Sequence, residues 1–329
     1  MGRTVIIGAG AVGAGTAAEL ALRGLDHLLI GRGQQISHIA EHGLRYIRPD
    51  GQRRVRLSTA ETIDAAQLRD DDLLILATKT QHVEQASEQL AWKRAGTLLA
   101  ADLPILTLQN GLAAERILLR RFSHVYGGSI RTPASYTEIG TVTSGAAPKL
   151  AAFVLGSMPS GVDETAAEIA ERLRSIGWLV QLDDNVIRWK ALKLLHSVKN
   201  GLELLDVGSL NAQMQADRLG RMLSQEAAAV FEAAGIPVAS DEERTTDMTQ
   251  FVVDPASGYR EDRQSTWQSF ARGAATHEAD FLNGEIVQLG RLHGVATPAN
   301  AALQRALGRA WQTGTHPGSV AVPEVDDAT

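Results

Sequence analysis

The chain has 329 residues, a formal net charge of −6 at pH 7 and no cysteine. Without cysteine there is no disulfide scaffold, no cysteine nucleophile and no metal site held by thiolates. The nine histidines lack metal-binding spacing, so no metal is expected. The negative charge argues against a nucleic-acid partner, and no apolar run is long enough to span a membrane. We expect a cytoplasmic protein of about two domains.

Short apolar runs alternate with longer helical patterns in the first half of the chain, which is typical of a parallel sheet with crossover helices. The expected strands are residues 5–7, 27–30, 73–77, 105–108, 124–126, 150–155 and 178–182. The expected helices are residues 13–23, 82–90, 113–121 and 164–175. Two further strand-like runs, 43–48 and 54–57, flank an Asp-Gly turn and predict an inserted hairpin.

The second half of the chain is mostly helical in pattern. The expected helices are residues 185–205, 212–234, 264–282, 284–294 and 299–313, the last one following Pro298. Residues 240–262 are polar and are expected to form a loop with some helix. The pattern therefore predicts an α/β domain over residues 1–183, an all-helical domain over 184–314 and a disordered tail over 315–329.

The strongest local motif is G-A-G-A-V-G, which directly follows the first expected strand. In this G-x-G-x-x-G pattern, Gly8 allows a tight turn, Gly10 lets the backbone approach a pyrophosphate, and Gly13 lets the next helix pack closely on the sheet. The helix N-terminus then offers N–H donors to phosphates. The alternative is a plain glycine turn. The motif predicts a dinucleotide site that includes Gly8, Ala9, Gly10, Ala11, Val12 and Gly13.

The end of the second strand bears on the choice of cofactor. An NAD site usually has an acidic residue there for the ribose 2′-hydroxyl, whereas this chain has Gly31 and Arg32. A guanidinium at this point suits a 2′-phosphate, so the sequence favours NADP(H) over NAD(H). The alternative is that Arg32 is an ordinary surface arginine.

Two polar residues follow other strands of the expected sheet. Lys79 comes after the strand at 73–77, and Asn110 after the strand at 105–108. Ligands of open parallel sheets bind beyond the carboxyl ends of the strands, so both residues are candidates to border the nicotinamide half of the cofactor. The alternatives are a solvated lysine at a helix start and an Asn-Gly turn.

Three of the six lysines, Lys190, Lys193 and Lys199, fall within ten residues of one another. On a helix with about 100° per residue, Lys193, Ser197 and Asn200 lie within about 60° of one another, and Lys190 lies on the same side. Leucines flank this stripe. A lysine there would be partly desolvated, which lowers its pKa and makes it a better proton donor near neutral pH. The alternative is a solvated basic face.

A later helical pattern carries Ser265 near its start and Glu278 and Asp280 near its end. Two carboxylates that are two residues apart point to different sides of a helix, so only one of them is expected to face a given cleft. A carboxylate near Lys193 would keep that lysine charged and could bind a substrate hydroxyl.

In combination these residues resemble the ketopantoate reductase (2-dehydropantoate 2-reductase) family, from Gly8 to about Gly308. The resemblance is carried by residues 8–13, Arg32, Lys79, and residues 109–111, 189–200, 265–269 and 278–284. It implies a Rossmann-type parallel-sheet domain and an all-α C-terminal domain like that of 6-phosphogluconate dehydrogenases, with the active site in the cleft between them. It also implies NADPH-dependent reduction of a 2-keto acid to a 2-hydroxy acid, which in true members is 2-dehydropantoate to pantoate in pantothenate biosynthesis.

The resemblance also implies roles for single residues. Lys193 resembles the catalytic lysine that donates a proton to the ketone oxygen. Lys190 is the alternative, because the spacing from Trp189 is longer than in the shortest family pattern. Glu278 resembles the glutamate that orders the cleft around substrate and cofactor.

Other positions resemble the family's binding residues. Asn110 resembles the asparagine near nicotinamide and substrate, and Lys79 the lysine that lines the cofactor cleft. Ser265 resembles the serine that binds the substrate carboxylate, and Asn200 and Asn211 resemble further substrate-binding asparagines. A homodimer through the helical domain is expected by resemblance.

The sequence departs from the family at two places. Four residues after the catalytic lysine, members often carry a substrate-binding asparagine, where this chain has Ser197, and residues 240–264 look longer than in compact members. These differences bear on the substrate, which could be another branched or hydroxylated 2-keto acid. The further alternatives are a related two-domain dehydrogenase acting on a hydroxy acid or making opines, and a non-catalytic NADPH-binding regulatory protein.

Overall fold

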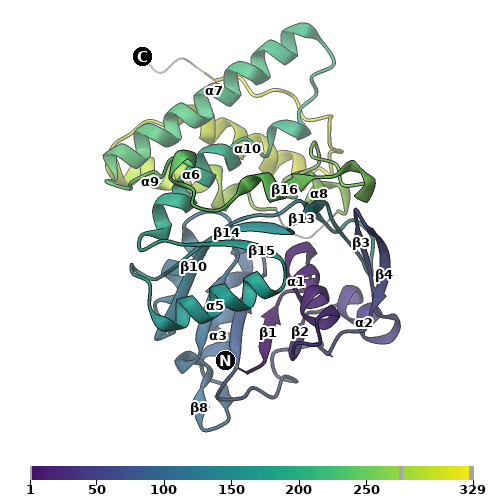
Figure 1. The fold of residues 1–329 in the computed structure, drawn as a ribbon. Coiled ribbons are helices and arrows are strands. Elements are labelled where there is room, and N and C mark those ends of the chain that lie inside the picture. Colours follow the sequence, from purple (N-terminus) through teal and green to yellow (C-terminus); the bar gives the residue numbers. More distant parts are fainter. Residues whose placement is uncertain (1, 274–276, 326–329) are drawn as a thin grey trace. The chain divides into compact units, whose positions relative to one another are not determined.

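The computed structural model describes residues 2–273 and 277–325, which form two compact units (Figure 1). The first unit holds residues 2–109, 114–186 and 241–260, and the second holds 110–113, 187–240 and the described part of 261–325. The units therefore do not divide the chain at a single point near residue 184, because residues 241–260 return to the first unit.

An eight-stranded sheet forms the centre of the first unit, in the order β15-β14-β10-β9-β6-β1-β2-β5. Its strands are β1 (Thr4–Ile7), β2 (His27–Ile30), β5 (Thr59–Ala60), β6 (Leu73–Leu76), β9 (Pro104–Thr107), β10 (His124–Arg131), β14 (Ala151–Ser157) and β15 (Trp178–Leu182). All seven strands expected for this sheet are present, and β5 is added at its edge. Every neighbouring pair is parallel except β10–β14, which is antiparallel.

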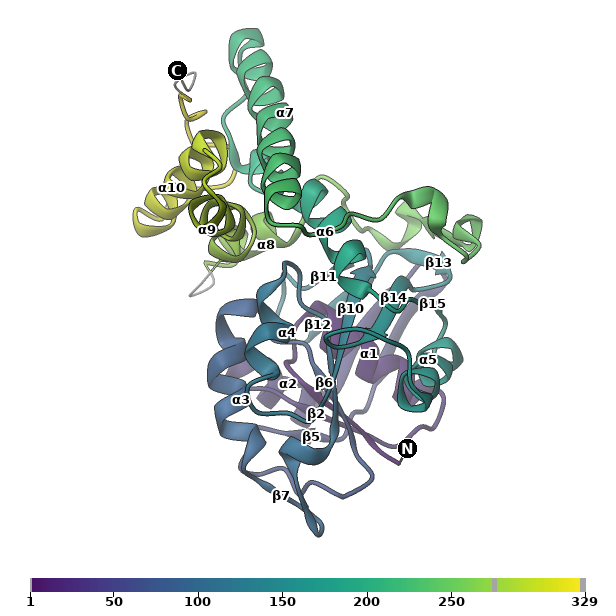
Figure 2. The same cartoon turned by 90° about the vertical axis from the view of Figure 1, so that its left-hand side faces the viewer.

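Helices cover both faces of this sheet (Figure 2). Helices α1 (Ala11–Leu22) and α5 (Glu164–Ser175) pack on one face, and α3 (Val83–Ala91) and α4 (Ala113–Leu118) pack on the other. Strand β1 supplies both cores, because Ile6 faces the first pair and Val5 and Ile7 face the second, as alternation along a strand requires. The sequence analysis missed α2 (Gln34–His42), whose buried apolar residues are only Ile36 and Ile39.

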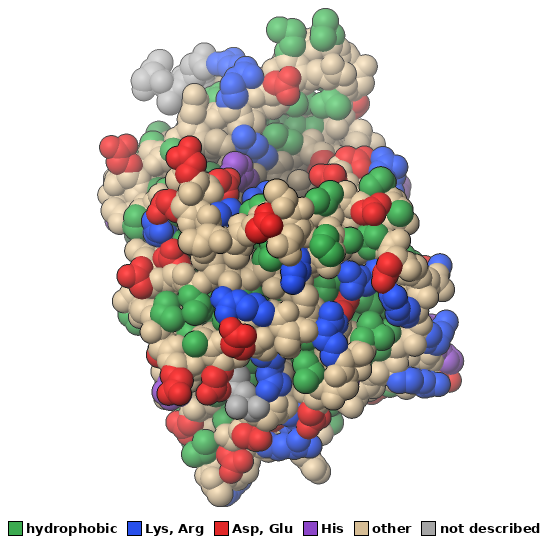
Figure 3. Space-filling model, in the orientation of Figure 1, with side chains coloured by type: hydrophobic (Ala, Val, Ile, Leu, Met, Phe, Trp, Pro, Cys, Tyr) green, Lys and Arg blue, Asp and Glu red, His purple; other side chains and the backbone are tan. Residues whose placement is uncertain are grey.

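A second sheet lies beside α1, in the order β11-β12-β3-β4. Its strands are β11 (Ala134–Ser135), β12 (Thr141–Ser144), β3 (Leu44–Arg48) and β4 (Gly51–Val55). The predicted hairpin is confirmed as β3–β4, although β4 starts at Gly51, earlier than expected. Exposed arginines Arg53, Arg54 and Arg56 line its outer edge, where basic side chains gather in Figure 3.

Residues 241–260 contain a strand that the sequence analysis did not predict. Strand β16 (Phe251–Val253) pairs antiparallel with β13 (Ala146–Pro148). Three single-turn 3-10 helices surround it: η4 (Asp241–Glu243), η5 (Met248–Gln250) and η6 (Pro255–Ser257). The remaining short elements of the first unit are β7 (Arg94–Ala95), β8 (Leu98–Leu99), η1 (Thr80–His82) and η2 (Ala100–Asp102).

The second unit is helical, as expected. It holds α6 (Val186–Ser197), η3 (Leu202–Leu204), α7 (Leu210–Ala233), α8 (Ser265–Ala271), η7 (Ala279–Phe281), α9 (Asn283–His293) and α10 (Pro298–Gln312). Among the described residues no helix is long and apolar enough to cross a membrane.

Two predicted helices of this unit are too long. The helix expected over 185–205 ends at Ser197, and the chain then passes so close to α10 that a Cβ at Gly201 would lie 2.5 Å from Cδ1 of Leu307. The helix expected over 264–282 ends at Ala271, followed by Gly273 in the left-handed region at φ +56°. Residues 274–276 of that expected helix lie outside the described residues.

The segment expected to be a disordered tail is ordered over residues 315–325. Val320 is buried in the core of the second unit, its N–H donates to the carbonyl of Leu204, and its own carbonyl accepts from the N–H of Asp206 at 2.7 Å. The prediction of disorder is therefore wrong for this part, because the buried valine and its backbone hydrogen bonds hold the chain. Residues 326–329 lie outside the described residues.

Candidate functional site

A cavity of about 530 Å³ opens in the first unit at the carboxyl ends of three neighbouring strands. Its walls include residues that follow β1, β2 and β6, the strands at which the order of the sheet reverses. The crevice beside such a reversal is where open α/β sheets bind their ligands. We call this cavity the switch-point pocket.

The glycine loop forms one wall of the switch-point pocket. Gly8 adopts φ +123°, and a Cβ there would lie 2.6 Å from the carbonyl carbon of Ala77. A Cβ at Gly13 would collide with the carbonyl oxygen of Gly8, whereas a Cβ at Gly10 would meet nothing within 4 Å. Gly8 and Gly13 are therefore required by the protein's own packing, and Gly10 leaves open space in front of the backbone.

Gly8, Ala9 and Gly10 line the switch-point pocket, but the other three residues of the motif do not. Ala11 and Val12 belong to the first turn of α1 and border a smaller cavity beside β3. Gly10 is the N-cap of α1 and, as a glycine, it offers no side-chain oxygen to the first N–H groups of the helix. This arrangement suits an anionic ligand.

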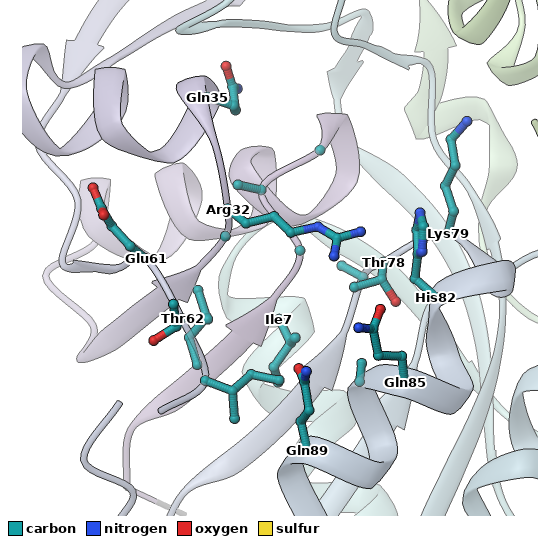
Figure 4. Close-up of a pocket in the computed structure, with 18 of the residues that line it drawn as sticks. Ile7, Arg32, Gln35, Glu61, Thr62, Thr78, Lys79, His82, Gln85 and Gln89 are labelled. Atoms are coloured by element: carbon teal, nitrogen blue, oxygen red, sulfur yellow. The ribbon is translucent and has the colours of Figure 1, made fainter. Parts of the chain in front are cut away.

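Three basic side chains line the same pocket: Arg32 after β2, Lys79 after β6, and His82 at the end of η1. Figure 4 shows the Arg32 side chain reaching toward Thr78 and His82. Burial lowers the pKa of His82 below its ordinary value, and the positive charges of Arg32 and Lys79 lower it further. These charges give this part of the pocket a positive potential that would attract a phosphate.

The carboxylates of the pocket have partners elsewhere. Glu61 accepts a hydrogen bond from the hydroxyl of Ser37 at 3.0 Å, and in Figure 4 it points away from Arg32. Asp64 accepts from the ammonium of Lys93 at 2.6 Å. These contacts leave the basic side chains as the main electrostatic feature of the wall near Arg32.

Sequence reasoning missed several pocket residues. They include Gln35 of α2, Glu61 and Thr62 after β5, His82 at the end of η1, and Gln85 and Gln89 of α3. Among the described residues, the buried Nε2 of Gln35 finds no hydrogen-bond acceptor, while its Oε1 accepts from the N–H of Gly140 at 2.7 Å. His82 follows Lys79 by three residues, and this short spacing is the sequence feature that could have indicated His82 as a pocket residue.

Two residues of the Gln-Asn-Gly motif after β9, Gln109 and Gly111, have a structural role. The Gln109 amide donates to the carbonyl oxygens of Leu76 and Thr78, both at 2.9 Å, and so ties the end of β9 to the end of β6. Gly111 has φ +76°, and a Cβ there would collide with the carbonyl oxygen of Phe281. Asn110 belongs to the second unit and does not line the switch-point pocket.

The polar stripe expected on the lysine helix is shorter than predicted. Lys193 and Ser197 lie on α6, but Asn200 follows the helix in a turn, where its N–H donates to the carbonyl of Ser197. The premise that Asn200 shares the helical stripe is therefore wrong. Lys190 is 2% exposed and Lys193 is half-buried.

The other substrate candidates lie on different elements of the second unit. Asn211 is exposed in the first turn of α7. Glu278 is buried just before η7, whereas Asp280 is exposed and accepts from the amide of Gln304 at 2.7 Å. The two carboxylates thus face different surroundings, as expected, although the segment is a 3-10 turn and not the α-helix that was predicted.

Ser265 begins α8, and its buried hydroxyl oxygen makes no hydrogen bond to the described residues. The carboxylate of Glu203 accepts hydrogen bonds from the backbone N–H groups of Gln264 and Trp267, which precede and follow Ser265 in the chain. A buried hydroxyl without a partner costs free energy, which makes it a candidate to bind a ligand. The sequence analysis did not predict the role of Glu203.

Two family models match the chain: Ketopantoate reductase PanE/ApbA over residues 4–158, and Ketopantoate reductase PanE/ApbA C terminal over residues 196–310. The chain belongs to the ketopantoate reductase family. A 2-dehydropantoate 2-reductase of Pyrococcus horikoshii is 28% identical over 300 residues, which cover 91% of this chain and 94% of that protein. The corresponding protein of Archaeoglobus fulgidus is 27% identical, with 92% of this chain and 95% of that protein covered.

Solved structures agree with the fold of this ketopantoate reductase family member. A PanE/ApbA family ketopantoate reductase of Ralstonia eutropha aligns with a TM-score of 0.76 and 25% identity over 95% of this chain and 100% of that one. D-mandelate dehydrogenase in complex with NADH and anilino(oxo)acetate aligns with a TM-score of 0.75 and 22% identity, covering 95% and 99%. Family membership makes the chain an oxidoreductase acting on CH–OH groups, and ketopantoate reductases use NADPH.

Proposed function

We propose that this chain uses NADPH to reduce a 2-keto acid to a 2-hydroxy acid, with 2-dehydropantoate as the preferred substrate. The observation that carries the proposal is the switch-point pocket, where the glycine loop, Arg32 and Lys79 line one cavity. Relatives named 2-dehydropantoate 2-reductase match about nine-tenths of the chain and support the choice of substrate.

The residues of the pocket fit a phosphorylated dinucleotide. The open space in front of Gly10 and the uncapped start of α1 suit a pyrophosphate. Arg32 and Lys79 would hold the 2′-phosphate, Arg32 through its planar fork of donors and Lys79 as a point charge. When bound, NADPH supplies a hydride to the carbonyl carbon of the substrate.

The second unit would supply the proton and the substrate contacts. The ammonium of Lys193 would donate a proton to the ketone oxygen, and the Ser265 hydroxyl would donate a hydrogen bond to the substrate carboxylate. Glu278 would order the site around the substrate, with Asn110 bordering the nicotinamide. Ser197, Asn200 and Asn211 remain candidates for further substrate contacts.

A second candidate is a different 2-keto acid. Ser197 stands where many family members carry an asparagine, and a serine hydroxyl is shorter and lacks the amide. D-mandelate dehydrogenase, which shares the fold, was solved with the keto acid analogue anilino(oxo)acetate. A bulkier keto acid is therefore the main competitor of 2-dehydropantoate.

The test is NADPH oxidation with 2-dehydropantoate and a panel of other 2-keto acids, run in parallel with NADH. We expect turnover with NADPH and the highest kcat/KM for 2-dehydropantoate. A protein that binds NADPH but oxidises it with no member of the panel would refute the reductase assignment. A higher kcat/KM for an aromatic keto acid would select the second candidate.

Lys193→Met and Lys190→Met form a matched pair on α6. Loss of a general acid costs about 10²–10⁴-fold in rate, and we expect that loss in kcat for Lys193→Met alone. The opposite pattern would move the proton donor to Lys190. Titration of NADPH binding to both variants separates a catalytic defect from loss of the cofactor site.

A further inference from the structure

Glu203 holds the start of α8 from another part of the chain. It lies in η3, and its two carboxylate oxygens are 3.1 and 3.0 Å from the backbone nitrogen of Gln264, with Oε1 also 3.3 Å from that of Trp267. The N-cap residue Gln264 makes no side-chain cap of its own. The first turn of α8 therefore depends on Glu203 for acceptors to these two N–H groups.

The backbone beside Glu203 is held in the second unit by hydrogen bonds and by packing. The carbonyl of Leu204, the next residue after Glu203, accepts from the N–H groups of Gly318 and Val320 at 3.0 and 3.1 Å. Leu204 and Val320 are both buried in the core of the unit. Because the backbone next to Glu203 is held by these hydrogen bonds and by the packing of Leu204, the position of the Glu203 carboxylate is fixed.

Ser265 lies between the two N–H groups that Glu203 binds. Its hydroxyl oxygen is buried and makes no hydrogen bond to the described residues, and the same holds for Oγ1 of Thr266. Both hydroxyls face the cost of an unmade hydrogen bond. Glu203 therefore fixes the backbone at the point where the proposed ligand of the substrate carboxylate begins.

A carboxylate in this place is costly to ionise. Burial raises the pKa of Glu203 to about 7, the two backbone N–H groups lower it, and the negative charge of Asp262 raises it. η3 holds no other charged residue, and the nearby Arg263 places its guanidinium 4.5 Å from the ring of Trp267. A neutral glutamine could also accept a hydrogen bond here without that cost, so stability alone does not account for the carboxylate.

We propose that Glu203 is a positioning residue for the substrate: its carboxylate fixes the first turn of α8 and thereby places the Ser265 hydroxyl to bind the carboxylate of the keto acid. This inference rests on the role of Ser265 in the proposed function. Glu203 does not touch the reacting atoms, and its effect is transmitted through the backbone of residues 264–267.

The proposal has a pH consequence. The ionised carboxylate offers acceptors on both oxygens, whereas the protonated group keeps one strong acceptor, so the hold on α8 weakens as pH falls through about 7. The KM for the keto acid should therefore rise as pH is lowered through that range. The affinity for NADPH, which is proposed to bind the first unit, should not follow the same profile.

The experiment compares Glu203→Gln with the wild-type protein, using 2-dehydropantoate and NADPH between pH 6 and 8. We expect a KM about 10-fold higher at pH 8, the size of one hydrogen bond to a charged group, with kcat changed less than about two-fold. We also expect the wild-type dependence of KM on pH to disappear in the variant. The Kd for NADPH, measured by fluorescence titration, should stay at the wild-type value.

Glu226→Gln is the matched control. The carboxylate of Glu226 accepts from the N–H groups of Ala299 and Asn300 at 2.7 and 2.9 Å, and so holds the start of α10 in the same way. No proposed substrate residue lies on α10. Glu226→Gln should therefore lower thermal stability and leave KM and its pH profile unchanged.

Ser265→Ala separates failure of this inference from failure of the proposed function. If Ser265→Ala leaves KM unchanged, the role of Ser265 itself is wrong. If Ser265→Ala raises KM and Glu203→Gln does not, only the positioning role is refuted. In the double variant the two effects should not add, and full additivity would also refute the proposal.

The pH profile keeps the proposal testable even if Glu203→Gln fails to fold. The wild-type KM should change near pH 7, and in Ser265→Ala that change should be absent. A wild-type KM that is constant from pH 6 to 8, or one that changes equally in Ser265→Ala, would refute the positioning role.

Discussion

Replacement of Gly10 by alanine should weaken cofactor binding without harming the protein. Gly10 has φ −79° and ψ −170°, which alanine adopts freely, and its added Cβ meets no atom within 4 Å. Fewer unfolded conformations should then stabilise the free protein by about 0.4–1 kcal/mol. The same methyl group would occupy the space where a pyrophosphate approaches the backbone. Loss of one or two hydrogen bonds to a charged group, at about 1.5 kcal/mol each, predicts a Kd for NADPH raised about 10- to 100-fold.

Gly13→Ala should have the opposite effect on the stability of the free protein. Its Cβ would collide with the carbonyl oxygen of Gly8 and lie 3.0 Å from the Cβ of Ala77, so the backbone must move. We expect a loss of about 1–3 kcal/mol in the free protein. Thermal unfolding without cofactor and fluorescence titration of NADPH measure the two effects. Wild-type NADPH affinity in Gly10→Ala, or wild-type stability in Gly13→Ala, would refute the reasoning.

Three further predictions concern charge. Arg32→Gln should raise the Kd for NADPH about 10-fold or more and leave that for NADH nearly unchanged, and an equal loss for both cofactors would remove the role of Arg32 in selectivity. His82 has a lowered pKa that a bound 2′-phosphate should raise, so NADP⁺ binding takes up a proton and tightens as pH is lowered. His82→Gln should flatten this dependence in pH-resolved titrations, and an unchanged slope would contradict it. The folded-state pKa of Glu203, about 7, lies above its ordinary 4.5, so the stability it contributes is present below pH 4.5 and lost as pH rises through 7. The free energy of unfolding of Glu203→Gln, relative to that of wild type, should therefore be higher at pH 8 than at pH 5 by about 2 kcal/mol, after a discount for partial exposure. An equal difference between variant and wild type at both pH values would refute this.

The sheet of the first unit could be read from local pattern. Apolar runs such as Leu73–Leu76 are buried on both faces, and this makes them continuous in the sequence and easy to recognise. The glycine loop was equally clear, because its three glycines stand at fixed spacing directly after a strand, although the contact that requires Gly8 is with the distant backbone of Ala77. Arg32 and Lys79 were found by their position after strands, and the structure brings both to one pocket.

The ends of the helices could not be read in this way. α6 stops at Ser197 although the apolar pattern continues, because the chain at Gly201 packs against Leu307, more than 100 residues later. Likewise, β16 forms only because β13 offers it a partner. Hydrophobic periodicity reports which residues are buried, and it does not report what they are buried against.

By itself, the sequence predicted the positions of the main strands along the chain, the glycine turn after the first strand, and the candidate residues at the strand ends, since local residue patterns record each of them. Only the tertiary structure decided that His82 joins Arg32 and Lys79, that Val320 orders the C-terminal segment, and that Glu203 holds the start of α8. These contacts join segments that lie far apart in the chain. Their energies arise from burial and hydrogen bonding across that distance, which no local pattern of residues records.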